Sequence, residues 1–170
     1  MEGSQTMGAG LKLNLGAGSR PIEGAVNVDI IERPGIDLVC DLNAPWPWAP
    51  STVDLIVSED CFEHLYPLGK AEGQMNIVEV MKRVWTALKP GGVLHVQVPS
   101  TDSRAAFQDP THVTYWNINT FRYFVKGYPH WILYQGFGVV FEYGEDGFVK
   151  AIPRDETGAG WVEARLRAVK

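Results

Sequence analysis

The connection between the first two apolar segments is the strongest constraint on this chain, because it is too short for an ordinary helix. Residues 11–15 and 25–30 have the pattern of buried strands, and only ten residues, 16–25, connect them, of which the last already belongs to the second segment. Those ten include Pro21 and three glycines, which disfavour a helix interior, so one helical turn is the most that fits. A pyrophosphate is normally bound at the N-terminus of a full helix at this point. The connection therefore argues against a dinucleotide ligand.

The spacing of the acid at the end of the second strand supports the same conclusion. Asp29 follows Gly16 by 13 positions (29 − 16), where a dinucleotide fold has about 20. A glycine turn lets a ligand approach bare backbone, and a carboxylate at a strand end can accept both hydroxyl hydrogens of a ribose. The residues thus favour a ligand with a ribose and no phosphate. S-adenosylmethionine (SAM) is such a molecule.

Short apolar strands alternate with turn residues along most of the chain. They are expected at residues 11–15, 25–30, 37–40, 53–58 and 92–98, with a helix over 74–88 in which apolar residues recur at three and four positions. Strands buried on both faces around such a helix indicate a parallel α/β sheet. Residues 99–136 are aromatic and irregular, with a short helix expected near 117–125. Strands are expected again at 137–143, 148–152 and 161–169.

Composition restricts the class of protein. With 170 residues, 45% of them hydrophobic, residues 10–170 fit one domain, and residues 1–9 are expected to be a disordered tail. The net charge of −5 and the scattered basic residues argue against nucleic acid as a partner. Cys40 and Cys61 are expected to be free thiols, and no stretch has the features of a signal peptide or membrane span, so we expect a cytoplasmic protein.

From about residue 10 to 169 the motifs resemble, in order and register, those of class I SAM-dependent methyltransferases, in particular small members of the methyltransferase type 11 kind. "LNLGAG" at 13–18 is similar to the first motif of the family, and "LKPGGVLHVQVPS" at 88–100 to the turn and strand five. The resemblance implies a Rossmann-like, mostly parallel, seven-stranded sheet with antiparallel C-terminal strands and a reduced first helix. It implies that SAM contacts Asn14, Gly16, Ala17, Gly18, Asp29, Ile30, Asp41, Leu42, Ser58 and Glu59.

Several of these positions also have a purely structural interpretation. Many family members carry an acid where this chain has Asn14. Asp41 can cap a turn before Asn43 instead of lying near an adenine. Trp46 and Trp48 can simply cover the edge of the sheet instead of stacking on a base.

Candidate catalytic residues lie in "FQDPTHVTYWNINTF", residues 107–121. His112 can act as a base near neutral pH, Asp109 can orient it, and Tyr115 and Trp116 can line an acceptor pocket. The alternative is that Asp109 forms a turn and His112 bonds a backbone carbonyl. His64 is a candidate substrate-binding residue that can equally well pack. The four histidines have no metal-ligand spacing, so no metal is expected.

The sequence therefore predicts a methyltransferase that uses SAM on a small-molecule or glycan-type acceptor, by direct displacement of the methyl group. Acceptor specificity is expected to come from residues 99–136, from a partner protein or from a homodimer. Two alternatives stay open, namely a SAM-binding module or scaffold without turnover, and a nucleotide- or NAD-binding Rossmann enzyme.

Overall fold

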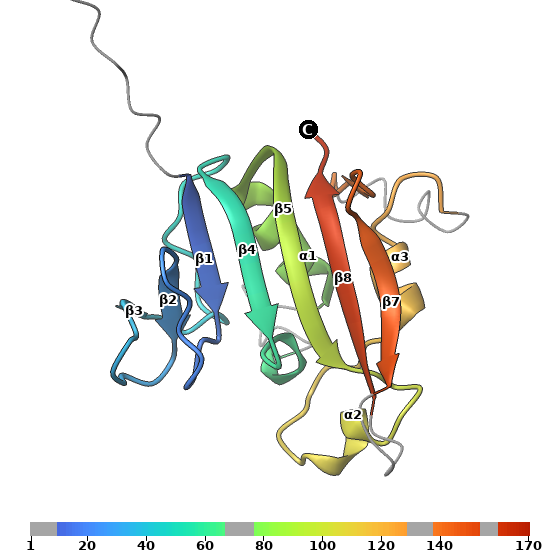
Figure 1. Cartoon of the computed structure of the whole chain (residues 1–170), viewed down its shortest axis with the longest axis horizontal. Coiled ribbons are helices and arrows are strands. Elements are labelled where there is room, and N and C mark those ends of the chain that lie inside the picture. The colour runs from blue at the N-terminus through green and yellow to red at the C-terminus, as the bar shows by residue number, and fades with distance from the viewer. Residues whose placement is uncertain (1–9, 67–76, 129–137, 154–159) are drawn as a thin grey trace, which may run out of the picture.

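A single twisted sheet organises the protein (Figure 1), and the computed structural model describes residues 10–66, 77–128, 138–153 and 160–170. The expected tail at 1–9 and the first residues of the expected helix, 74–76, lie outside the described residues. The elements in chain order are β1 Leu11–Leu15, β2 Val26–Asp29, β3 Leu38–Val39, β4 Val53–Glu59, the 3₁₀ helix η1 Phe62–His64, α1 Ile77–Ala87, β5 Leu88–Pro99, α2 Ala105–Gln108, α3 Ile118–Arg122, β6 Phe141–Glu142, β7 Phe148–Pro153 and β8 Gly160–Ala168.

The sheet has the expected mixture of parallel and antiparallel strands. Its order is β3-β2-β1-β4-β5-β8-β6, with β7 also paired to β8. The first five strands are parallel, and β8 runs antiparallel to β5, β6 and β7. Because β6 pairs with residues 167–168 of β8 and β7 with residues 160–165, the two share one edge of β8. The eight strands lie at the eight expected segments, and they fill the seven expected positions across the sheet because β6 and β7 share one position beside β8.

The connections between the first strands confirm the reduced first helix. No helix occurs among residues 16–25, which form turns held by backbone hydrogen bonds such as Arg20 N–H to the Ala17 carbonyl at 2.8 Å. The helix expected near 74–88 is present as α1, which buries Val80, Met81 and Val84 at helical spacing. Strand β5 starts at Leu88, before the expected Gly92. It contains a register shift that accommodates Lys89–Gly92, with Gly91 at φ +77°.

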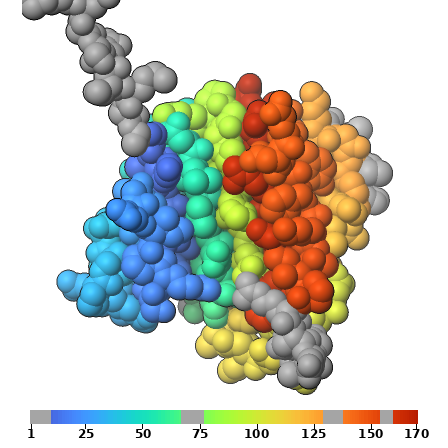
Figure 2. Space-filling view, in the orientation of Figure 1, coloured from blue at the N-terminus to red at the C-terminus, as the bar shows by residue number. Residues whose placement is uncertain are grey.

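The described helices cover only one face of the sheet. The expected burial on both faces therefore holds at the carboxyl ends of β1 and β5, where successive residues are buried, but not along the whole of the strands. In Figure 1, α1 and α3 lie behind the strands, and Figure 2 shows strand side chains forming the surface in front. Burial alternates along β8, as expected for a strand that is covered on one face only. Val162, Ala164 and Leu166 are buried, while the residues between them are partly exposed. The physical reason is that the connections 16–25, 30–37 and 40–52 contain no helix that could cover the second face.

The segment after β5 returns to the carboxyl ends of the strands. It contains α2 and then α3, which begins at a capping box in which the Asn117 side chain accepts from Thr120 N–H while the Thr120 hydroxyl accepts from Asn117 N–H. This locates the short helix that the sequence predicts near 117–125. Within the described ranges, no helix is both long and apolar enough to cross a membrane.

Candidate functional site

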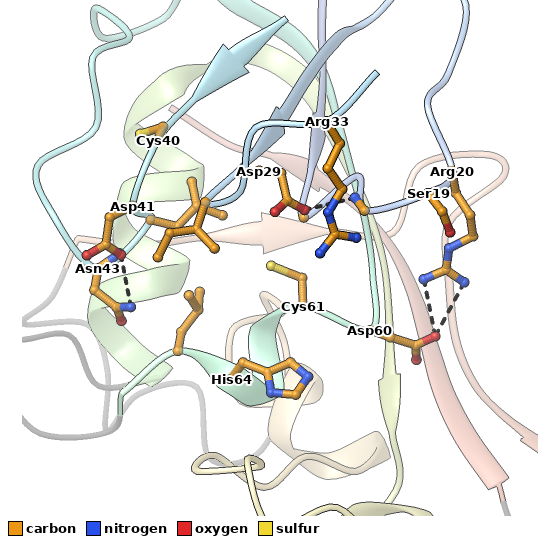
Figure 3. Close-up of a pocket in the computed structure, with 15 residues that line it drawn as sticks. Ser19, Arg20, Asp29, Arg33, Cys40, Asp41, Asn43, Asp60, Cys61 and His64 are labelled. Atoms are coloured by element: carbon orange, nitrogen blue, oxygen red, sulfur yellow. Dashed lines mark hydrogen bonds and ion pairs between the residues drawn. The ribbon is translucent and has the colours of Figure 1, made fainter. Parts of the chain in front are cut away.

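A cavity of about 590 Å³ opens at the carboxyl ends of β1, β2 and β4 (Figure 3). Its size is in the range of small-molecule sites, which are typically about 300–1,000 Å³. Several residues that the sequence predicts to contact a cofactor and the candidate His64 line it together with residues that the sequence did not single out. The lining consists of Gly16, Gly18, Ser19, Arg20, Asp29, Ile30, Arg33, Cys40, Asp41, Leu42, Asn43, Asp60, Cys61, His64 and Leu65.

The glycine turn forms one wall and is fixed from behind. The backbone N–H groups of Gly16 and Ala17 both donate to the Val28 carbonyl at 2.9 Å, so the turn is tied to β2. Gly16 has φ +72°, and a Cβ there would lie 2.4 Å from Cys61 Cβ. Gly18, at φ +53°, has open space instead, with only the Gly16 carbonyl oxygen at 4.0 Å. The turn therefore presents bare backbone to the cavity.

Asp29 orders the same turn. One carboxylate oxygen accepts from Gly18 N–H at 2.8 Å and the other from Ile31 N–H at 2.9 Å. Each oxygen keeps a second lone pair, so the carboxylate can still accept from a ligand hydroxyl. Ile30 beside it is 61% exposed, which makes it an apolar surface for a ligand.

Opposite Asp29, Asp41 and Leu42 follow β3. Asp41 accepts from the backbone N–H of Asn43 at 2.9 Å and from its side-chain amide at 3.1 Å, so the turn-capping interpretation agrees with the structure. Asp41 nevertheless also lines the cavity. Burial raises the pKa of the Cys61 thiol on the cavity floor to about 12, and this side chain is neutral at physiological pH.

Four expected cofactor contacts lie outside the lining of this cavity. Asn14, Ala17 and Glu59 line a neighbouring hollow of about 230 Å³, and Ser58 lines neither. The Asn14 amide donates to the Arg20 carbonyl and to Asn27 Oδ1, both at 2.9 Å, which braces the glycine turn. The fully buried Ser58 donates to the Leu15 carbonyl at 3.0 Å. Both residues support the site from behind.

A smaller cavity of about 200 Å³ adjoins the first, and Asp60 and His64 line both. The residues from 99 onward supply its other side, including Asp109 and His112. Asp60, at φ +50°, accepts from Trp161 Nε1–H at 2.7 Å, and Arg20 Nη2 lies 3.4 Å from its other oxygen. These bonds hold the wall that the two cavities share.

His112 and Asp109 lie near each other, although their side chains are farther apart than a hydrogen bond. His112 Nδ1 lies 3.1 Å from the Ala106 carbonyl, and its Nε2 lies 3.8 Å from Asp109 Oδ2. Hydrogen bonds from the Thr111 hydroxyl and backbone N–H lower the pKa of the Asp109 carboxyl. The bond from His112 to a backbone carbonyl, which is expected if this residue is only structural, is present. It uses Nδ1 alone, so Nε2 faces the Asp109 carboxylate.

Glu63 is a residue that the sequence reasoning missed. It is 1% exposed, and its Oε1 lies 4.0 Å from His112 Nε2. Burial raises the pKa of this carboxyl to about 8, although its own backbone N–H opposes the shift. The candidate residue His64, next to Glu63 in the sequence, already pointed to this segment. The burial of Glu63, however, depends on a distant loop, in which the N–H groups of Val113 and Thr114 donate to the Glu63 carbonyl at 2.8 and 3.0 Å.

The two aromatic candidates for an acceptor pocket have different environments. Tyr115 is 48% exposed and stacks on Phe107, with ring centroids 5.3 Å apart. Trp116 is fully buried in the core, where it stacks on Phe121 and donates to the Thr114 hydroxyl at 2.9 Å. The structure thus assigns Trp116 to the core instead of to an acceptor pocket, because its ring packs against Phe62 and Phe121.

Known proteins resemble this chain in their structures, whereas comparison of sequences finds no match. No protein-family model and no curated protein matches the sequence. An Archaeoglobus fulgidus SAM-dependent methyltransferase superposes with a TM-score of 0.63 and 14% identity, over 94% of this chain and 86% of that one.

Two further structures hold ligands. One is a Burkholderia thailandensis 1,6-didemethyltoxoflavin N1-methyltransferase with bound 1,6-didemethyltoxoflavin and S-adenosylhomocysteine (TM-score 0.60, 14% identity, 94% of this chain, 71% of that one). The other is a Haemonchus contortus phosphoethanolamine N-methyltransferase in complex with phosphomonomethylethanolamine and S-adenosylhomocysteine (0.60, 13%, 98% and 50%). The chain spans half the length of the latter. The fold of this protein is that of the class I SAM-dependent methyltransferases, as its motifs predict.

Proposed function

We propose that this protein is a SAM-dependent methyltransferase that acts on a small-molecule or glycan-type acceptor. The observation that carries the proposal is the 590 Å³ cavity at the ends of parallel strands, which is lined by bare backbone at Gly16 and Gly18 and by the carboxylate of Asp29 bonded to that turn. Two solved structures of this fold hold S-adenosylhomocysteine together with a small-molecule substrate.

The chemistry of the lining fits SAM. Asp29 would accept from the ribose hydroxyls, and the apolar Ile30 and Leu42 would contact the adenine together with Asp41. The glycine turn would bind the amino-acid end, and the guanidinium of Arg33, drawn toward the cavity in Figure 3, is a counter-charge for its carboxylate. When bound, SAM supplies an electrophilic methyl group on a positively charged sulfur.

The smaller cavity would hold the acceptor. The acceptor atom attacks the methyl carbon while the carbon–sulfur bond breaks and its electron pair stays on sulfur. For a hydroxyl acceptor, His112 Nε2 would take the proton, with the ring oriented by the Ala106 carbonyl on Nδ1, and the Asp109 carboxylate 3.8 Å from Nε2 would stabilise the imidazolium that forms. Most of the rate enhancement is expected from alignment of the two reactants and exclusion of water.

A specific observation disfavours the nucleotide or NAD alternative. A pyrophosphate needs the free N–H groups and dipole of a helix N-terminus, and none follows β1 in residues 16–25. A SAM-binding module without turnover shares the first cavity and differs only in lacking transfer.

Ligand titration and product analysis test the proposal in sequence. Calorimetry with SAM, S-adenosylhomocysteine and NAD should give binding to the first two only, and NAD binding alone would refute it. Mass spectrometry of a cell extract incubated with isotope-labelled SAM should then detect a methylated product. His112→Ala should keep cofactor affinity and lower transfer about a hundredfold or more. Tight SAM binding with no product in any extract would favour the module without turnover.

A further inference from the structure

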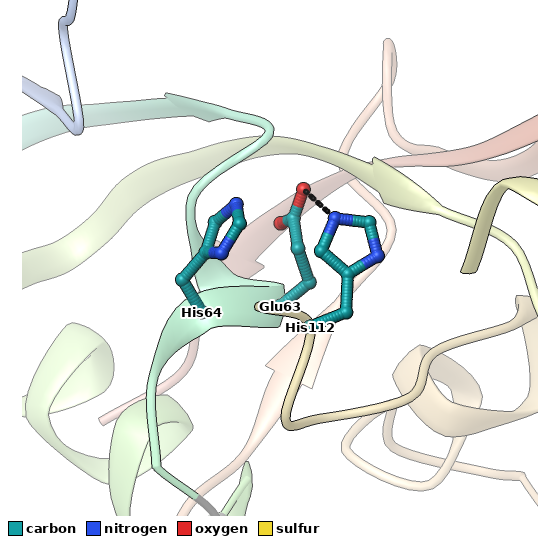
Figure 4. A group of neighbouring side chains, drawn as sticks. All are labelled: Glu63, His64 and His112. Carbon is teal, nitrogen blue, oxygen red and sulfur yellow. Dashed lines mark ion pairs between the residues drawn. The ribbon is translucent and has the colours of Figure 1, made fainter. Parts of the chain in front are cut away.

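Three side chains with metal-binding chemistry meet beside the two cavities. Glu63 and His64 come from η1 and His112 from the segment after α2 (Figure 4). One ligand atom from each lies within 4.8 Å of those of the other two. The rings of His64 and His112 are 4.9 Å apart and nearly perpendicular, and they flank the Glu63 carboxylate in Figure 4. Because His112 is distant in sequence from the other two, residue spacing gave no indication of this group.

The hydrogen bonds of the two rings indicate which nitrogen carries the hydrogen. His112 Nδ1 lies 3.1 Å from the Ala106 carbonyl, and His64 Nδ1 lies 3.2 Å from the Thr111 carbonyl. A carbonyl only accepts, so each Nδ1 must donate. In the neutral imidazole each Nε2 then carries the lone pair that a metal ion could use, whereas in an imidazolium it would carry a second hydrogen. Histidines that ligate metals are oriented in this way, with one ring N–H bonded to a backbone carbonyl.

The carboxyl group of Glu63, beside the two rings, accepts no side-chain hydrogen bond within the described ranges. Glu63 is 1% exposed, and neither of its oxygens has a hydrogen-bond partner among the described residues. A buried polar atom without a partner costs about 1–3 kcal/mol. Because burial raises the pKa of this carboxyl to about 8, a cation that binds it at neutral pH would replace its proton. Asp109 Oδ2, at 3.8 Å from His112 Nε2, adds another acceptor. Lone pairs therefore converge on one space, and a cation would satisfy all of them.

We propose that Glu63, His64 and His112 bind a divalent transition-metal ion, for which Zn²⁺ is the expected occupant. Two imidazoles and one carboxylate form a known catalytic zinc set, which leaves one position open. Bonds of about 2.0–2.2 Å place the ligand atoms of a tetrahedral site about 3.3–3.5 Å apart. The side chains would therefore move together by about 1 Å from their present separations of 4.0 Å, for His112 and Glu63, and up to 4.8 Å.

The open position gives the ion a role that rests on the proposed function. The ligands line the cavity assigned to the acceptor, and His64 also lines the cavity assigned to SAM. An acceptor hydroxyl bound to the ion would have a lowered pKa and would release its proton to water. Its oxygen would then attack the methyl carbon while the carbon–sulfur bond breaks and the electron pair stays on sulfur. In that state the Nε2 of His112 is a ligand, so the ion replaces His112 as the group that activates the acceptor.

Metal titration of the full chain after dialysis against a chelator tests this site. Calorimetry with ZnCl₂ should give one site of micromolar or tighter Kd, and CoCl₂ should give the intense visible absorption of a four-coordinate ion. Glu63→Gln, which keeps the shape of the side chain, should weaken Zn²⁺ binding at least tenfold, and so should His64→Ala, which keeps Glu63 in place. His95→Ala is the matched control, because His95 bonds Glu163 on the open face of the sheet.

The outcomes separate this proposal from the proposed function. Lack of Zn²⁺ binding by the folded wild type, or equal affinity in all four proteins, would overturn the metal site. S-adenosylhomocysteine binding, measured on the same metal-free protein, tests the methyltransferase assignment independently. Thermal unfolding of each variant verifies that it is folded, and loss of binding in either folded ligand variant supports the site.

Discussion

A methyl group added at Gly16 tests whether the glycine turn is as closely packed as the structure indicates. The Cβ of Gly16→Ala would lie 2.4 Å from Cys61 Cβ and 2.5 Å from its sulfur. Overpacking of this kind costs about 1–3 kcal/mol. The left-handed backbone, at φ +72°, adds about 1–2 kcal/mol for any residue other than glycine. The sum is about 2–5 kcal/mol of unfolding free energy.

Gly24→Ala is a matched control, because Gly24 has φ +75° and nothing lies within 4 Å of the position that a Cβ would occupy there. It carries the backbone cost alone, so Gly16→Ala should exceed it by about 1–3 kcal/mol in urea unfolding followed by circular dichroism. Adding Cys61→Gly should recover most of that excess in a double-mutant cycle. If both alanine variants lose equal stability, the packing of Cys61 against the turn is refuted.

Three further predictions concern the cofactor pocket, the core and pH. Asp29→Ala, which removes the acceptor for Gly18 and Ile31 N–H, should weaken S-adenosylhomocysteine binding about tenfold or more, and unchanged affinity in calorimetry would remove Asp29 from the site. Trp116→Ala should cost about 3–5 kcal/mol in urea unfolding, and a loss below about 1 kcal/mol would contradict its burial. Although burial raises it, hydrogen bonds, first that from His95, lower the pKa of Glu163 below its ordinary value of 4.5. The charged form therefore stabilises the fold above pH 4.5, so the stability difference between wild type and Glu163→Gln should shrink as pH falls below 4.5, and a pH-independent difference would contradict this.

The sequence alone determined the order of the strands along the chain and predicted that the glycine turn and Asp29 lie together at one cavity. The ten-residue connection after β1 excluded a full helix on local grounds, because proline and glycine act on the backbone wherever they occur. Asp29 and the glycine turn are adjacent to strand ends, and parallel strands bring their carboxyl ends to one edge, so their convergence was predictable. The alternation in residues 161–169 likewise predicted the half-buried β8, which is confirmed.

Only the tertiary structure decided what lies on each face of the sheet and what surrounds His112. The open face depends on several helix-free connections at once, so no single segment indicated it. Glu63 and His112 meet because backbone bonds from Val113 and Thr114 dock one loop on η1, a contact between segments distant in the chain. Trp116 is a residue type that often lines pockets, but here its ring is buried against Phe121 and against Phe62, which comes from a distant part of the chain. The chemistry of each residue and its local backbone preference follow from the sequence. Long-range packing decides which of these groups are buried together.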